Sequence, residues 1–134
     1  MTLQANKDLV RRFYAEAINA RDLGAVDRLL AEDFTHDDEP RGRAGQRAAV
    51  EAFLAGFSDL RNEVLTILAE DDLVAAHQRW TGTHDGPFAG FEPTGRRVEF
   101  TSTAILRIAG GEIAAAWDEV DMLGLTGQLA TAPS

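Results

Sequence analysis

The sequence contains no cysteine among its 134 residues. Without thiols, the chain cannot form a disulfide, a cysteine-ligated zinc site or an iron–sulfur cluster, and thiolate catalysis is excluded. No apolar stretch approaches the roughly 20 residues that span a bilayer, and the start, MTLQANKDLVRRFY, has no apolar signal core. We therefore expect a cytoplasmic protein that does not associate with a membrane.

Basic residues are also few. The chain has 13 Lys and Arg against 22 Asp and Glu, which gives a formal charge of −9 and a pI near 4.7. Nucleic acid is not an expected partner, because binding to phosphates needs a basic surface. The hydrophobic fraction of 45% is ordinary for a globular protein. The length predicts a single domain over residues 1–134, with a flexible tail from about residue 126 to 134.

Helical spacing marks the first part of the chain. Apolar residues that recur every three or four positions predict a helix over roughly residues 6–20. A short second helix carries Val26 and Leu29, with Asp22 as a plausible N-cap. A third helix contains Phe53. The helices therefore come first, and the remainder of the chain has a different period.

The later part of the chain reads as strands rich in Val, Ile, Leu, Thr and Trp. A short strand precedes the third helix, and four longer ones follow it: Phe34–His36, then Val64–Ala69, Leu73–Thr83, Val98–Ile108 and Ile113–Leu123. We expect an α+β fold in which three N-terminal helices pack on a curved, mostly antiparallel mixed sheet. Such a cone-shaped barrel encloses an apolar cavity.

A hairpin signal at Gly110-Gly111 sets the register of the last two strands. Counting outwards from this turn places Trp117 opposite Ala104 and Glu119 opposite Ser102. Because side chains alternate along a strand, Trp117 and Glu119 are then expected on the face that the apolar residues occupy.

Asp121 is expected on the same face as Trp117 and Glu119. Two carboxylates on an apolar interior face would lose hydration, which raises their pKa towards values useful for proton transfer. The alternative for Asp121 is a strand-end aspartate that reaches water or caps a backbone amide. The alternative for Glu119 is an ion pair with an arginine across the sheet. We expect Asp121 to be the proton-transfer group.

The opposite face of the sheet has apolar residues among polar ones. They are Ile105, Ala114, Ala116, Val120 and Met122. An apolar patch on an otherwise solvated sheet face invites a partner, so we expect a homodimer through this face.

The cavity should hold a small molecule. We expect a volume on the order of 300 Å³ and walls that include Trp80, Phe100, Ala104, Leu106, Trp117 and Phe53. Gln78 and Ser102 are polar residues in apolar rows, and each could hydrogen-bond a ligand or a partner within the sheet. His84, in the GTHDG turn, is expected to hold a loop through bonds to the backbone.

His36-Asp37-Asp38-Glu39 looks like a metal-ligand cluster. Adjacent strand residues point to opposite faces, so they cannot all ligate one ion. We expect no metal and no cofactor, with His36 or Asp38 turned inwards.

Three segments resemble the SnoaL-like polyketide cyclases, a branch of the superfamily of nuclear transport factor two, ketosteroid isomerase and scytalone dehydratase. They are NKDLVRRFYAEAINARDLGAVDRLLAEDF, TGTHDGPFAGFEPTGRRVEF and LRIAGGEIAAAWDEVDMLGL. The resemblance covers nearly the whole chain and implies the cone-shaped fold. It implies the reaction less directly, because the superfamily includes isomerases, lyases, cyclases, hydrolases and binding modules.

The resemblance also implies roles for individual residues. Asp121 matches the acid/base aspartate of the cyclases, Tyr14 the hydrogen-bonding tyrosine of the ketosteroid isomerases, and Asp38 the position of their general base. Ala104 stands where those isomerases carry a second aspartate, so their oxyanion site is incomplete. The histidine that partners the cyclase aspartate is absent, and Ser102 is near its place.

These features favour a cofactor-independent cyclase or isomerase that uses general acid/base catalysis on a small, apolar, carbonyl-bearing metabolite of polyketide type. Asp121 is the leading catalytic candidate, with Glu119, Asp38 and Tyr14 as further ones. The alternatives are water activation, as in epoxide hydrolases, and a noncatalytic ligand-binding or dimerisation module. For Tyr14, a buried phenol with a satisfied hydroxyl is the structural alternative.

Overall fold

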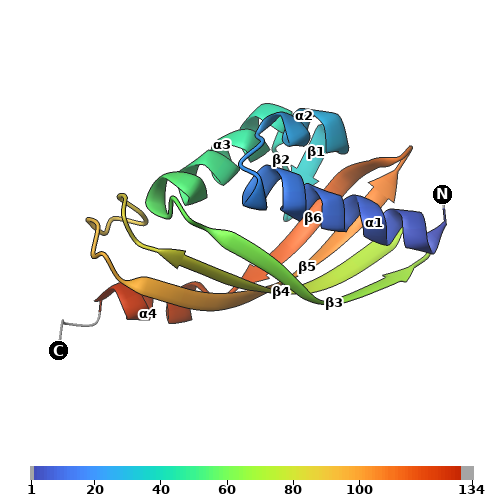
Figure 1. The fold of residues 1–134 in the computed structure, drawn as a ribbon. Helices are drawn as coiled ribbons and strands as arrows, with labels where there is room; N and C mark the ends of the chain where they lie inside the picture. The colour runs from blue at the N-terminus through green and yellow to red at the C-terminus, as the bar shows by residue number, and fades with distance from the viewer. Residues whose placement is uncertain (1, 131–134) are drawn as a thin grey trace.

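The computed structural model describes residues 2–130, and its first three helices lie over one face of a single curved sheet (Figure 1). The helical segments are α1 (Leu3–Phe13), η1 (Tyr14–Asn19, a π-helical turn), α2 (Gly24–Leu29), α3 (Gly42–Gly56) and α4 (Met122–Ala130). The strands are β1 (Leu30–His36), β2 (Glu39–Pro40), β3 (Arg61–Glu70), β4 (Leu73–Thr83), β5 (Arg97–Ala109) and β6 (Glu112–Val120). No helix within residues 2–130 combines the length and apolar character needed to cross a bilayer.

The six strands form one mixed sheet in the order β2-β1-β6-β5-β4-β3. β1 and β6 run parallel, and the other neighbouring strands are antiparallel. The cone-shaped α+β fold and the mostly antiparallel sheet are therefore confirmed. The parallel pair matters for function, because it brings the end of β1 next to β6.

A bulge near the start of β6 changes the register that the hairpin turn predicts. Ile108 pairs with Ile113, but the next residue back, Arg107, pairs with Ala115. Ala114 is therefore an extra residue that has no partner of its own in β5. Beyond it, every side chain of β6 points to the face opposite the one counted from the turn.

The bulge puts a different acid on the inner face. Ala104, which is buried in the core, pairs with Asp118, whereas the exposed Ile105 pairs with Trp117. The prediction that Trp117 and Glu119 lie on the inner face is wrong. The predicted pairs of Trp117 with Ala104 and of Glu119 with Ser102 are wrong for the same reason.

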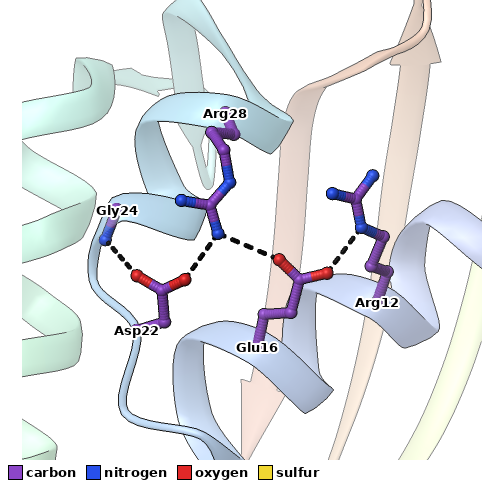
Figure 2. Close-up of polar contacts among 5 residues, drawn as sticks. All are labelled: Arg12, Glu16, Asp22, Gly24 and Arg28. Atoms are coloured by element: carbon purple, nitrogen blue, oxygen red, sulfur yellow. Dashed lines mark hydrogen bonds and ion pairs between the residues drawn. The ribbon is translucent and has the colours of Figure 1, made fainter.

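An ion-pair network links η1 to α2 (Figure 2). Glu16 accepts bonds from both Arg12 and Arg28, and Arg28 also bonds Asp22. Asp22 also accepts from the amide of Gly24, although the N-cap of α2 is Leu23, one residue after the predicted position. Between 29% and 55% of each charged side chain is exposed. Such pairs contribute little to the free energy of folding, so the network mainly orients α2 against η1.

The chain does not fray at residue 126 as predicted. Residues 122–130 form α4, in which Leu125 and Leu129 are buried. The side chain of Gln128 bonds both backbone groups of Glu99 on β5. The rest of the predicted tail, residues 131–134, lies outside the described residues.

Candidate functional site

A cavity of about 360 Å³ lies between the helices and the inner face of the sheet. Most of its wall is apolar, and it includes the predicted residues Phe53, Trp80, Phe100 and Leu106. Their role in binding a substrate stays a prediction. Ala104 is also on the inner face, but it is covered by neighbouring side chains and is not part of the cavity wall.

Three aromatic rings, which we call the aromatic panel, form one part of the wall. The rings of Trp80 and Phe100 are 6.0 Å apart with an angle of 2° between their planes. Phe53, from α3, lies 6.3 Å from each of them at 25–26°. The indole N–H of Trp80 donates to Ser102 at 2.8 Å, which fixes the plane of the ring. The panel therefore offers flat apolar surface to a planar ligand.

His36 lies between two carboxylates at the wall of the same cavity. Its Nε2 is 3.3 Å from Oδ2 of Asp118, and its Nδ1 is 3.3 Å from Oδ2 of Asp37. The other oxygen of Asp37 accepts from the backbone N–H of Asp118 at 3.0 Å. The contact of Nε2 with Asp118 has the geometry of a hydrogen bond. These three residues, the His36 cluster, form a compact group that can hold and transfer protons.

Tyr14, in η1, is one of the polar residues on the helical side of the cavity. Burial raises the pKa of its phenol well above the usual range, and the charge of Asp118 raises it further. A hydrogen bond with Gln78 lowers this pKa to a smaller extent. Tyr14 is therefore a neutral hydrogen-bond donor in the same cavity wall as Asp118.

A chain of buried amides holds Gln78 behind Tyr14. The Gln78 carbonyl oxygen accepts from the side-chain Nδ2 of Asn62 at 2.6 Å, and the backbone N–H of Asn62 donates to Oδ1 of Asn19 at 2.8 Å. Gln78 was expected to hydrogen-bond either a ligand or a partner within the sheet. Its carbonyl oxygen has a partner within the sheet. Gln78 acts on the cavity through Tyr14 rather than by lining it.

Asp121 does not reach the cavity, so the prediction that placed it there is wrong. It follows β6 and caps α4, where its Oδ1 accepts from the amide of Gly124 at 2.8 Å. Its own amide donates to Thr101, and it lines a separate open depression together with Glu119. Both carboxylates are exposed. Asp121 misses the cavity because the bulge at Ala114 reverses the faces of β6. It takes the capping role that was its predicted alternative.

Asp38 is turned away from the cavity as well. Its Oδ1 accepts from the indole N–H of Trp117 at 3.0 Å, and the guanidinium of Arg107 lies 5.2 Å from the centre of the Trp117 ring. Asp37 and Asp38 both have positive φ angles in the turn after β1. In this turn Asp37 lines the cavity and Asp38 does not. The predictions that Asp38 turns into the cavity and that Trp117 forms part of its wall are therefore wrong.

Four polar residues of the wall were not predicted to lie there: Asp37, Arg41, Gln46 and Asp118. Gln46 could have been found, because it precedes Ala49, Val50 and Phe53 by three, four and seven positions and so shares their helix face. Asp118 could not, since no feature of the sequence marks the extra residue at Ala114.

His84 holds the loop between β4 and β5 as expected. Its Nδ1 accepts from the amide of Thr94 at 3.1 Å and lies 3.0 Å from the Thr94 hydroxyl. The ring is fully buried beside Phe57, and its Nε2 has no hydrogen-bond partner among the described residues. His84 therefore has a structural role, and it is not part of the cavity wall.

The fold and the cavity can be compared with known proteins. The sequence profile of the SnoaL-like polyketide cyclases matches residues 8–129, which is nearly the whole chain. The protein belongs to the SnoaL-like polyketide cyclase family. No curated protein has a significantly similar sequence.

Several solved structures share the fold of this family member over almost their full length. AclR from Streptomyces galilaeus, for which a hydroxylase activity has been suggested, is 31% identical with a TM-score of 0.87, over 98% of this chain and 100% of AclR. TsrD from Streptomyces laurentii is 29% identical with a TM-score of 0.89, over 98% and 99%. IdmH from Streptomyces antibioticus, a suggested polyketide cyclase, is 30% identical with a TM-score of 0.83, over 94% and 99%.

Proposed function

We propose that the protein is a cofactor-independent cyclase or isomerase that acts by general acid/base catalysis on a planar, largely apolar carbonyl compound. Membership of the SnoaL-like polyketide cyclase family supports this proposal. The observation that carries it is the carboxylate of Asp118, held by His36 and near the neutral phenol of Tyr14, at the wall of an apolar cavity.

Asp118 is the proton acceptor in this proposal. Its carboxylate removes a proton from the carbon next to the ligand carbonyl, and the electron pair of the broken C–H bond moves onto the carbonyl oxygen. Tyr14 donates a hydrogen bond to this oxygen as negative charge develops on it. In a cyclisation, the enolate carbon then attacks a second carbonyl of the same molecule, and the proton returns to the new alkoxide. In an isomerisation, it returns to another carbon.

His36 positions the acceptor. Its Nε2–H donates to Asp118, which leaves the second carboxylate oxygen available for the ligand. Asp37 fixes His36 from the other side and also holds the Asp118 backbone amide. The aromatic panel supplies the surface on which a planar ligand lies. Every group that this mechanism requires belongs to the chain itself.

Proton exchange into a model ketone tests the proposal. β-Tetralone is a bicyclic ketone with a flat aromatic ring and acidic protons next to its carbonyl, and their replacement by deuterium can be followed by proton NMR in D2O. The wild-type protein should accelerate this exchange above the rate in buffer, and Asp118→Asn should lower the protein-catalysed rate by about a hundredfold or more. Binding of the ketone without any acceleration would instead favour a noncatalytic ligand-binding module.

A further inference from the structure

Arg41 is a cation in the cavity wall that has no carboxylate partner among residues 2–130. Seven other arginines form ion pairs: Arg12, Arg28, Arg43, Arg47, Arg79, Arg97 and Arg107. Within residues 2–130, the Arg41 guanidinium makes a single hydrogen bond, from Nη1 to Oε1 of Gln46 at 2.9 Å. A guanidinium has five N–H donors, so most of its donors remain free for a ligand.

The two acidic residues of the cavity wall, Asp37 and Asp118, already have partners of their own. Asp118 pairs with His36, while Asp37 pairs with His36 and with the Asp118 amide. Neither forms an ion pair with Arg41. Arg41 is only partly exposed, and a partly desolvated cation gains most from an acceptor that carries a negative charge. The protein does not supply that acceptor within the described residues.

The local backbone holds Arg41 against α3. A Cβ atom at Gly45 would lie 2.8 Å from Cγ of Arg41, so the glycine makes room for the arginine stem. Gln46 follows on the same helix and accepts from the guanidinium through its oxygen, which turns its N–H2 group into a second free donor. The first turn of α3 contains no acidic residue and has no side-chain cap. Its helix dipole therefore adds positive potential at this end of the cavity.

We propose that Arg41 and Gln46 bind a carboxylate of the ligand, so that the substrate is an aromatic or polycyclic keto acid rather than a neutral ester. This inference rests on the proposed function, since it concerns the ligand of the same site. The carboxylate lies at Arg41, the flat part of the molecule on the aromatic panel, and the reacting carbonyl at Asp118 and Tyr14. A guanidinium suits this role because its planar fork matches a carboxylate.

Binding of a matched acid and ester tests this inference. Trp80 lies in the cavity wall and Trp117 on the outer face, so in a Trp117→Phe background the fluorescence reports on Trp80 alone. The probes are naphthoate and its methyl ester, which have the same ring and differ in charge. The formal charge of −9 disfavours anions in general. A preference for the acid of about tenfold or more would therefore point to a local charge-assisted bond.

Arg41→Gln should remove the preference for the acid and leave the affinity for the ester nearly unchanged. Arg41→Lys keeps the positive charge but lacks the paired N–H donors of the guanidinium, so it should retain part of the preference for the acid. Arg61→Gln is the matched control, because it removes the same charge from an exposed position on β3 outside the cavity wall. It should behave like the parent protein, and circular dichroism checks that each variant is folded.

Failure of this inference and failure of the proposed function give different results. If the parent protein binds neither probe, binds the ester as tightly as the acid, or keeps its preference in Arg41→Gln, the inference is wrong, whatever the exchange experiment gives. If the preference depends on Arg41 but tetralone exchange is absent, the carboxylate site stands and the catalytic proposal falls. Asp118→Asn should lose exchange and keep the preference for the acid.

Discussion

Nε2 of His36 lies 3.3 Å from Oδ2 of Asp118, although the two residues are 82 positions apart in the chain. They meet because β1 and β6 are the parallel pair of the sheet and His36 is in register with Ala116. The bulge at Ala114 then turns Asp118, and not its neighbours Trp117 and Glu119, towards the cavity. The candidate chemistry therefore depends on one strand pairing and one extra residue.

The phenol of Tyr14 should resist ionisation in the folded protein. Burial and the charge of Asp118 raise its pKa above the usual value of 10.0. Above about pH 10 the unfolded chain releases this proton and the folded protein retains it, so stability falls as the pH rises. Tyr14 is the sole tyrosine in the sequence, so ultraviolet absorbance of tyrosinate reports on it alone. We expect tyrosinate to appear only on unfolding, and Tyr14→Phe to lose stability less steeply above pH 10.

The same variant tests the role of Tyr14 in the cavity. Tyr14→Phe keeps the ring and removes one hydrogen bond, which is worth about 0.5–1.5 kcal/mol. The tetralone exchange rate should therefore fall by roughly 2- to 13-fold. An unchanged rate in a folded variant would show that the hydroxyl does not contact the developing charge.

Deletion of Ala114 should be far more harmful than its replacement. Without the extra residue, the rest of β6 would present its other face, which moves Trp117 inwards and Asp118 outwards. Urea denaturation should show a loss of more than about 3 kcal/mol or no cooperative folding. Ala114→Ser keeps the register and serves as the control. A deletion variant with normal stability and normal exchange would contradict the assigned register.

His84 should contribute to stability and not to turnover. Its fully buried ring accepts from the Thr94 amide, so His84→Leu leaves that amide without its partner. We expect a loss of about 1–3 kcal/mol in urea denaturation and faster proteolysis of the loop between β4 and β5. His77→Leu is the control, because His77 is exposed on the outer face and should change stability by less than about 0.5 kcal/mol. Equal losses in both variants would remove the special role of His84.

A homodimer through the outer face of the sheet remains our proposal, with a revised set of residues. Ala116 and Val120 were predicted to lie on this face, but they line the cavity. Leu68, Ala75 and Ile105 form a row across β3, β4 and β5, with Leu68 65% and Ile105 44% exposed. Sedimentation should show a dimer that Ile105→Lys weakens. The same charge at Leu123, on α4, should have no effect, and a wild-type monomer at high micromolar concentration would contradict the proposal.

The fold could be predicted from the sequence because its signals are periodic. Leu9, Val10 and Phe13 form a helix stripe, and β5 alternates between buried and exposed residues along its whole length. Patterns of this kind determine which face is buried without any knowledge of the tertiary structure. The resemblance to the SnoaL-like family rests on the same long segments, which is why the fold and the family agree.

The site could not be predicted in the same way, because it depends on local exceptions to those patterns. Ala114, Ala115 and Ala116 give no preference for either face, so nothing in the sequence indicates which alanine is the extra residue. Asp37 and Asp38 adopt left-handed backbone conformations, so strand alternation does not apply to them. The prediction that placed Asp121 on the cavity face failed for the first reason, and the prediction that Asp38 turns inwards failed for the second.

A comparison of Asp118→Asn with Asp121→Asn tests the central claim most directly. Both changes remove one carboxylate and keep the side-chain size, and asparagine can still cap α4 at position 121. We expect Asp118→Asn to lower the protein-catalysed exchange of tetralone by about a hundredfold or more and Asp121→Asn to leave it near the wild-type rate. The reverse pattern, loss of exchange in a folded Asp121→Asn protein with Asp118→Asn active, would contradict the account.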